Sequence, residues 1–481
     1  MRWPRPSMPV SGPIPHRHTA SPMLSGLLEM IDRYLSYKRV REFWLMAMFD
    51  YWNPHIERMP TEDLCKLQEE RLKSMVHYVY DHSPFYKERF KEAGVVPEDI
   101  KDLSDLTKLP FTYKVDLRNT YPTGMFSLPR NRIVRYHVSS GTTGKPTVVG
   151  YTKDDIEMWS DSLARALTSI GLGRGDVIQV GYSYGLFTGG LGLHYGAEKI
   201  GATVLPTGTG NTERQIMLMQ DLGSTAIACT PSYFLHIAEV AEKMGISIRD
   251  DTSLKVGVFG AEPWSDETRR RIEEATGIKA YDIFGTSEMS GPLFTECQQQ
   301  NGIHVWSDLF LIEVTDPKTG EQLPDGETGE LVITTLSKWA IPLIRYRIGD
   351  LTVINSEPCE CGRTHPRLMR ILGRTDDMIV IRGINVFPSQ VESVLMEIPE
   401  VGEHYQIIVD RKGPLDIMKV MVEVTETGFS DKIADLMSLS KMISKELKGV
   451  LNVVADVELV EPGTIPRSEG KAVRVIDKRK V

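Results

Sequence analysis

The chain has 481 residues, of which 41% are hydrophobic and 25% are charged, and its formal net charge is −9. Because this length exceeds that of an average single domain, we expect two or three packed units with substantial hydrophobic cores. The acidic balance includes no long run of lysine or arginine. It therefore argues against nucleic acid and anionic membranes as partners.

Residues 1–55 are expected to form an N-terminal extension that is partly flexible. Prolines at positions 4, 6, 9, 13 and 15 disfavour packed elements there, and the segment lacks the apolar core of a secretory signal. No apolar run approaches the roughly 18 residues of a membrane-spanning helix, so we expect a cytoplasmic protein. In that compartment the five cysteines are not expected to form a disulfide framework.

The first packed element is predicted to be a long helix that begins at Thr61, whose hydroxyl is suited to cap it, and ends before Pro84. The spacing of apolar residues indicates one buried face. This face consists of Leu64, Leu67, Leu72, Met75, Val76 and Val79.

Short apolar runs alternate with amphipathic stretches in the middle of the chain. The runs at 177–182, 224–230, 255–262 and 279–285 predict buried strands, and residues 265–276 predict a helix between two of them. This alternation is typical of an α/β fold. After a stretch rich in β-branched residues, the segment 374–481 predicts a small α+β domain, which leaves 56–373 as the large domain.

A loop rich in hydroxyl groups, "SSGTTGKPT" at 139–147, is a candidate phosphate-binding loop. It is not a nucleoside-triphosphatase P-loop, because only two residues separate Gly141 from Gly144 and Pro146 follows Lys145 where a hydroxyl is required. A flexible loop with one ammonium group is still suited to close over a triphosphate. The candidate residues are Ser139, Ser140, Gly141, Thr142, Thr143, Gly144 and Lys145.

This loop resembles the phosphate loop of the adenylate-forming superfamily, the acyl- and aryl-CoA synthetases. The resemblance continues in order through "YDIFGTSE" (281–288), "YRIGDL" (346–351), "GRTDDMIVIRG" (373–383) and "PRSEGK" (466–471). More particular forms, such as "CGRTHPR" (361–367) and "GINVFPSQVE" (383–392), are similar to the phenylacetate–CoA ligase family. The resemblance implies a large adenylation domain of several subdomains and a small mobile C-terminal domain on a hinge at Asp376.

The implied activity joins an aryl acid such as phenylacetate to CoA in two steps. The carboxylate would attack ATP to give an acyl-adenylate and diphosphate, and the CoA thiolate would then displace AMP. Lys145 and Lys471 would be catalytic, and Glu288 would hold Mg²⁺, which prefers oxygen ligands and phosphates. Besides the phosphate loop and Lys471, the implied ATP-binding residues are Asp282, Phe284, Gly285, Thr286, Ser287, Asp350 and Arg374.

The same resemblance indicates a pocket for the acid and a homodimeric assembly. An aromatic ring needs an apolar slot with edge and face partners, and small residues leave room for it. The chemistry therefore favours aryl acids over fatty acids. The expected pocket residues are Tyr184, Phe187, Gly260, Ala261, Glu262 and Pro263.

Four sulfur and imidazole side chains are candidate ligands of a structural zinc ion: Cys297, His304, Cys359 and Cys361. A Cys₃His set is typical of closed zinc sites, although this spacing is unusual for a zinc finger. His365 competes with His304 for the nitrogen position. The alternative is two buried cysteines and a surface turn without metal.

Two other functions are compatible with these motifs. One is an adenylating enzyme that loads its aryl acid onto a separate carrier protein. The other is a catalytically silent binding protein on the same fold, which the presence of all five charged motif residues disfavours. These five are Lys145, Glu288, Asp350, Arg374 and Lys471.

Overall fold

A computed structural model describes residues 51–139, 146–375, 377–382, 384–412, 415–425, 433–468 and 471–480. They belong to one compact unit, residues 50–481. Most of the expected N-terminal extension, the phosphate-loop residues 140–145 and the expected hinge residue Asp376 lie outside the described residues. Within the described ranges, no helix is both long enough and apolar enough to cross a membrane.

The described chain begins with three helices, α2 (Pro54–Glu57), α3 (Thr61–His82) and α4 (Pro84–Ala93). Helix α3 confirms the predicted long helix, and it buries every residue of the predicted face except Leu67, which is half-buried. The prediction that Thr61 caps the helix is wrong. Pro60 occupies the cap position and no side chain bonds the free amides, because the extended backbone of Pro60 places Thr61 already inside the helix.

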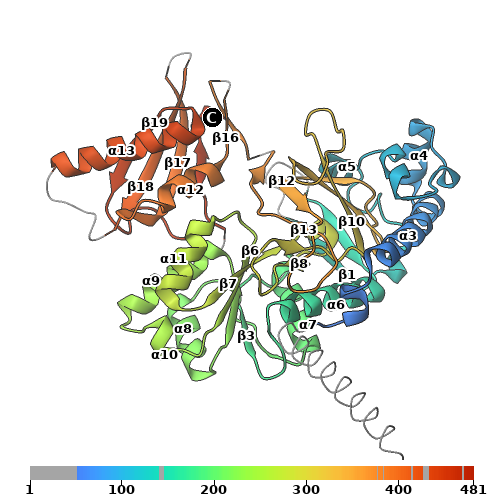
Figure 1. The fold of residues 1–481 in the computed structure, drawn as a ribbon, viewed down its shortest axis with the longest axis horizontal. Helices are drawn as coiled ribbons and strands as arrows, with labels where there is room; N and C mark the ends of the chain where they lie inside the picture. Colours follow the sequence, from blue (N-terminus) through green and yellow to red (C-terminus); the bar gives the residue numbers. More distant parts are fainter. Residues whose placement is uncertain are drawn as a thin grey trace, which may run out of the picture. The chain divides into compact units, whose positions relative to one another are not determined.

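The large domain contains a twelve-stranded sheet. Figure 1 labels several of its strands, among them β3, β6, β7 and β12. The parallel part of the sheet confirms the predicted buried strands. Next to this part the sheet continues through antiparallel pairs. The parallel strands are β4 (Thr203–Leu205), β3 (Val177–Val180), β5 (Ala226–Cys229), β6 (Val256–Gly260) and β7 (Lys279–Phe284), in that spatial order.

Helices cover both faces of the parallel strands, as the α/β prediction requires. Alternate residues of one strand enter different cores: Val258 packs in the core that includes α6 and α7, whereas Phe259 packs in the core that includes α8, α9 and α11. The bounds of the helices are α6 (Lys153–Ser169), α7 (Gly189–Lys199), α8 (Thr212–Asp221), α9 (Pro231–Lys243), α10 (Ile248–Asp251) and α11 (Asp266–Thr276).

Two further groups of strands complete the large domain. The hairpin β1 (Arg135–Val138) and β2 (Val148–Tyr151) flanks the phosphate loop. The short helix α5 (Lys114–Asn119) precedes this hairpin. The antiparallel strands are β8 (Phe294–Thr295), β9 (Ile303–His304), β13 (Arg367–Leu368), β12 (Tyr346–Asn355), β11 (Thr328–Thr335), β10 (Phe310–Thr315) and β14 (Gly373–Arg374).

The C-terminal segment has a hydrophobic core of its own, as expected for a small α+β domain. Its sheet has the order β19 (Ala455–Val460), β18 (Leu415–Val424), β17 (Val401–Lys412), β20 (Val475–Asp477). The segment also contains β15 (Ile379–Ile381), β16 (Ile384–Val386), α12 (Pro388–Met396) and α13 (Ile433–Leu451).

Candidate active site

Several predicted site residues of the large domain follow the carboxyl ends of the parallel strands. Tyr184 and Phe187 follow β3, residues 261–263 follow β6, and residues 285–288 follow β7. Strand β7 is also the point where parallel pairing changes to antiparallel pairing. Loops at such an edge are the usual ligand-binding position in α/β sheets.

The base of the phosphate loop contacts the predicted magnesium ligand. The Ser139 amide donates to the Thr147 carbonyl at 3.0 Å, and their hydroxyl groups are hydrogen-bonded. The Thr147 hydroxyl also donates to Glu288 Oε1 at 3.4 Å. Lys114, which the sequence analysis did not single out, places its Nζ 3.9 Å from the same oxygen. The buried Glu288 carboxylate is thus shared between the loop and a neighbouring cation.

The motif 281–288 packs closely against the following segment, residues 291–293. A Cβ on Gly285 would lie 2.7 Å from Cα of Gly291, so only glycine permits this approach of two chain segments. Tyr151 donates its hydroxyl to the Ser287 carbonyl at 3.3 Å, and Thr188 bonds the Ser287 hydroxyl at 3.3 Å. Phe284, at the end of β7, is half-buried.

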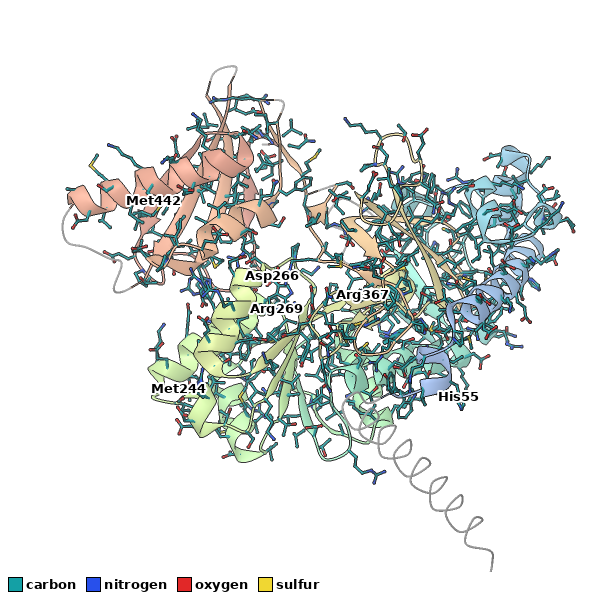
Figure 2. All side chains as sticks on the ribbon, viewed as in Figure 1. His55, Met244, Asp266, Arg269, Arg367 and Met442 are labelled. Carbon is teal, nitrogen blue, oxygen red and sulfur yellow. The ribbon has the colours of Figure 1, made fainter. Side chains whose placement is uncertain are left out.

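Asp282 is a buried carboxylate of this motif, as Glu288 is. Its amide donates to Glu296 Oε2 at 2.8 Å, and Arg269, labelled on α11 in Figure 2, donates to the other oxygen of Glu296 at 2.8 Å. Burial raises the pKa of the Asp282 carboxyl, although Arg370 and Arg269 oppose the shift. The structure therefore surrounds the Asp282 carboxyl with protein.

Two further predicted residues, Asp350 and Arg374, are paired across neighbouring strands. Asp350 of β12 stands opposite Arg374 of β14, and the Arg374 guanidinium donates to Asp350 Oδ1 at 2.7 Å. Arg374 also donates to the Ile348 carbonyl at 3.2 Å. This pairing fixes the orientation of the carboxylate that the resemblance assigns to ribose binding.

The charges of three other predicted site residues, Glu262, Asp350 and Arg374, act on the Lys471 ammonium group. The surrounding protein lowers the pKa of this group even though the residue keeps access to solvent. Glu262 opposes this shift most strongly, and Arg374 and Asp350 also act on the lysine. The structure therefore brings together the end of β6, the β12–β14 pair and the C-terminal lysine loop.

The residues predicted to form the acid pocket have more specific structural roles than expected. A Cβ on Gly260 would lie 2.1 Å from the Ile283 carbonyl oxygen, so the small residue permits β6 and β7 to pack rather than leaving room for a ring. Ala261 has φ +71°, a strained conformation that occurs often at functional sites. Pro263 is exposed. Glu262 accepts bonds from the amides of Ser232 and Ala472, both at 2.9 Å.

The loop after β3 carries the aromatic residues of the predicted pocket. Tyr184 makes an edge contact with His194 and bonds its Nδ1 at 3.3 Å. Burial raises the pKa of the Tyr184 hydroxyl, so the phenol stays neutral. Phe187 is 45% exposed, which leaves its ring available to a ligand.

Sequence reasoning missed Lys338, a fully buried lysine behind the motif 281–288. Its Nζ donates to the Ser290 hydroxyl at 3.0 Å and lies 4.0 Å from the centre of the Tyr151 ring. Burial lowers the pKa of Lys338 to about 8, and Asp155 opposes the shift. A single charged residue in the apolar run "LSKWAIPLI" (336–344) was the available signal.

The four candidate zinc ligands lie together in a buried cluster. One ligand atom from each of Cys297, His304, Cys359 and Cys361 falls within 4.8 Å of all the others. The Cys297 and Cys359 sulfurs are 3.7 Å apart, and the Cys361 sulfur is 3.4 Å from His304 Nε2. Three sulfurs and one imidazole nitrogen fit the donor set of a structural zinc site.

The structure distinguishes His304 from the competing His365. His304 Nδ1 lies 3.2 Å from the His365 carbonyl, which favours a proton on Nδ1 that donates to this oxygen. The unprotonated Nε2 then directs its lone pair toward the sulfurs. The His365 ring is occupied elsewhere, because its Nδ1 accepts from the Ser307 amide at 2.9 Å and its Nε2 lies 3.0 Å from the Ile56 carbonyl. His365 is therefore a neighbour of the cluster rather than a member.

Two family models match the chain: "AMP-binding enzyme" over residues 55–337 and "AMP-binding enzyme C-terminal domain" over residues 383–479. The phenylacetate-coenzyme A ligase of Thermus thermophilus is 50% identical over 444 residues, which cover 89% of this chain and 100% of that protein. The chain belongs to the phenylacetate–coenzyme A ligase family. The Escherichia coli phenylacetate-coenzyme A ligase is 46% identical, and the match covers 89% of this ligase and 97% of the Escherichia coli protein.

Solved structures of a 2-hydroxyisobutyryl-CoA ligase agree with this family and with the adenylate-forming fold. Its postadenylation state, in complex with an acyl-AMP, matches with a TM-score of 0.84 and 34% identity, and covers 89% of this ligase and 93% of that chain. Its thioesterification state matches with a TM-score of 0.67 and 35% identity, and the match covers 89% of this ligase and 92% of that chain. The present chain is therefore an AMP-forming acid–thiol ligase that uses ATP and CoA.

Proposed function

We propose that this ligase activates phenylacetate or a closely related arylacetic acid. The observation that carries the proposal is the convergence of Lys471, Glu262, Asp350 and Arg374 in a chain that is half identical to a phenylacetate-coenzyme A ligase. The half-exposed Phe187 and the Tyr184–His194 pair supply aromatic surface beside β3. Such surface suits the face and edge of a ring.

The charged residues have separate roles in this proposal. The Asp350 carboxylate, oriented by Arg374, would accept hydrogen bonds from ribose hydroxyls. Lys471 would stabilise the negative charge that develops when the acid attacks the α-phosphate of ATP. Lys145 and the rest of the phosphate loop would hold the departing diphosphate. The acyl-adenylate would then lose AMP to the CoA thiolate, so one cleft would serve both half-reactions.

Glu288 fits the role of a magnesium ligand. Its carboxylate is buried, and it lies beside the phosphate-loop residue Thr147. Mg²⁺ prefers carboxylate and phosphate oxygens, and when bound it would neutralise charge on the triphosphate. Lys114 would balance the Glu288 charge in the absence of the ion.

Product analysis with a panel of acids tests the proposed activity. AMP release from ATP is measured with phenylacetate, hydroxyphenylacetate, benzoate and aliphatic acids, each with and without CoA. We expect CoA-dependent turnover that is fastest with an arylacetate. Fastest turnover with an aliphatic acid would contradict the substrate class. Diphosphate release that does not respond to CoA would instead favour the carrier-protein alternative, which relatives named as coenzyme A ligases do not support.

We also propose that Cys297, His304, Cys359 and Cys361 hold a structural zinc ion. The geometry supports it through four converging donors and through the bond that orients His304. Zinc would connect β9 and the loop 359–361, segments more than 50 residues apart in the chain. Its contribution would be to stability rather than to the reaction, because all four positions of a tetrahedral ion would be filled by protein.

Metal analysis of the purified protein tests the zinc proposal. We expect about one zinc ion per chain, and we expect its loss in the double variant Cys359→Ser and Cys361→Ser. His365→Asn is the matched control, because this side chain bonds neighbouring backbone rather than the cluster. A folded, metal-free wild-type protein would contradict the proposal.

The homodimer is implied by the family resemblance, whereas the location and the domain limits come from the sequence pattern. We propose a homodimer in the cytoplasm with a role in phenylacetate catabolism, and domains at 1–55, 56–373 and 374–481. The two family matches, which lie on either side of residue 373, support the last boundary. Sedimentation of the purified protein at several concentrations tests the homodimer.

A further inference from the structure

The loop that carries Lys471 is fastened to helix α9 of the large domain. Arg467, four positions before the lysine, donates from Nε and Nη2 to the two carboxylate oxygens of Glu239 at 3.1 and 3.0 Å. Glu239 lies on α9 (Pro231–Lys243). This two-point geometry between a guanidinium and a carboxylate fixes direction as well as distance.

The other edge of Arg467 is held just as closely. Its Nη1 and Nη2 donate to the two oxygens of Glu423 on β18 at 2.8 and 2.9 Å. Glu423 also accepts from the Ile465 amide at 2.7 Å. Arg467 therefore connects α9 with the sheet of the C-terminal segment. Weaker bonds to Glu239 would release the lysine loop from α9 while its bonds to Glu423 remain.

A second contact fixes the loop on the far side of Lys471. The Ala472 amide donates to Glu262 Oε2, and the Ser232 amide at the start of α9 donates to Glu262 Oε1. The negative carboxylate also suits the N-terminal end of this helix. Lys471 thus lies between two attachments, and both lead to α9.

Glu239 is specialised for this contact by its surroundings. Besides Arg467 it accepts a bond from His404 Nε2 at 2.9 Å. Burial alone would raise its pKa, but His404 and Arg467 together lower the pKa to about 2. The carboxylate is therefore ionised throughout the physiological range, and it holds its partners as a charged group.

Two states of the solved relative differ in how well they match the present structure. The present structure matches the postadenylation state of 2-hydroxyisobutyryl-CoA ligase with a TM-score of 0.84, but matches its thioesterification state with 0.67 at the same coverage of this chain. The same relative therefore adopts more than one arrangement, and this ligase is more similar to the postadenylation state. In the present structure, which is more similar to the postadenylation state, the lysine loop contacts α9 through Arg467 and Glu239.

We propose that Glu239 is a positioning residue for Lys471, that it acts through Arg467, and that their ion pair forms for adenylate formation and parts for thioester formation. The proposal rests on the proposed function, because it requires the two half-reactions. In this proposal Glu239 acts through its bonds to Arg467 rather than on the substrate. Its effect is to hold the lysine ammonium where the α-phosphate charge develops.

Separate assays of the two half-reactions test this inference with Glu239→Gln. The substitution keeps the side-chain shape and removes the charge. Acid-dependent exchange of diphosphate into ATP reports adenylate formation, and thioester formation from supplied acyl-AMP and CoA reports the second step. We expect exchange to fall about 10-fold to 100-fold, as for other residues that orient a functional group, while the second step is kept or accelerated.

Glu242→Gln is the matched control, since Glu242 is an exposed residue on the same helix. It should leave both half-reactions unchanged. Equal losses in both steps for Glu239→Gln, or unchanged exchange, would overturn the inference. If wild-type protein showed neither exchange nor thioester formation with any acid of the panel, the proposed function itself would fail, so the two failures are distinguishable.

Discussion

At the scale of single residues, Lys338 shows how a charge is kept inside this protein. The ammonium faces the Tyr151 ring and the Ser290 hydroxyl, and Asp155 supplies the nearest opposing charge. No direct ion pair for Lys338 is present among the described residues. Burial therefore destabilises the charged form of Lys338, and the neighbouring groups only partly offset this free-energy cost.

Replacement of Lys338 by methionine is expected to change how stability depends on pH. Wild-type Lys338 has a pKa of about 8 when folded and about 10.5 when unfolded. Between these values the unfolded chain binds more protons, so wild-type stability rises relative to Lys338→Met, by up to about 3 kcal/mol. Urea unfolding at pH 7, 8, 9 and 10 measures the difference. A constant difference would contradict the shift, and Lys243→Met, at an exposed position, should give a flat control.

Lys471 gives the second prediction at this scale. Its substitution by alanine removes a positive charge from the site where the adenylate would form. Adenylate formation should fall by about 10²-fold to 10³-fold, whereas thioester formation from supplied acyl-AMP should be largely spared. Single-turnover assays of each step provide the measurement. Similar losses in both steps would show that Lys471 does not have the role assigned to it.

At the scale of elements, the sequence predicts those strands and helices that a local pattern of apolar residues determines. The parallel strands β3, β5, β6 and β7 are visible as apolar runs, and α11 as an amphipathic stretch between two of them. The short β4, which lies at the edge of the sheet, is not predicted. Strands such as β9 and β13 have two residues each, too few for a local pattern to indicate them, and their pairing with each other joins residues more than 60 positions apart. For the same reason the sequence does not show that Glu262 bonds Ala472, which lies 210 positions away.

The contact between α2 and the loop of the cysteine cluster provides a prediction for an element. Glu57 of α2 pairs with Arg363 at 2.8 Å, and both side chains are fully buried. Removal of one partner leaves an uncompensated buried charge. Glu57→Ala should therefore lower the free energy of unfolding by about 3–5 kcal/mol, measured by urea unfolding. Glu62→Ala, at an exposed position on α3, should change it little, and a similar value for both variants would contradict the argument.

At the scale of the whole molecule, polar contacts connect the C-terminal segment to the large domain. Glu392 of α12 accepts from the Ser265 amide at 3.1 Å and from the Thr268 hydroxyl at 2.9 Å. Arg271 of α11 donates to the carbonyls of Met396, Ile398 and Val401. Water can replace such bonds at small net cost, unlike the contacts of an apolar core. An interface of this kind suits the proposed release of the C-terminal domain between the two half-reactions.

Arg271→Ala tests whether these bonds set the balance between the two arrangements. Loss of a charged donor from three carbonyls should weaken this docking by roughly 1.5 kcal/mol, which corresponds to about a 10-fold lower rate of adenylate formation. Thioester formation from supplied acyl-AMP should be unchanged, because it does not require the contact. Arg270→Ala is the control, since the ion pair that this neighbour makes within the described part of the chain is with the exposed Glu274 on its own helix. If Arg270→Ala and Arg271→Ala slowed adenylate formation equally, the bonds to the C-terminal segment would not determine the balance.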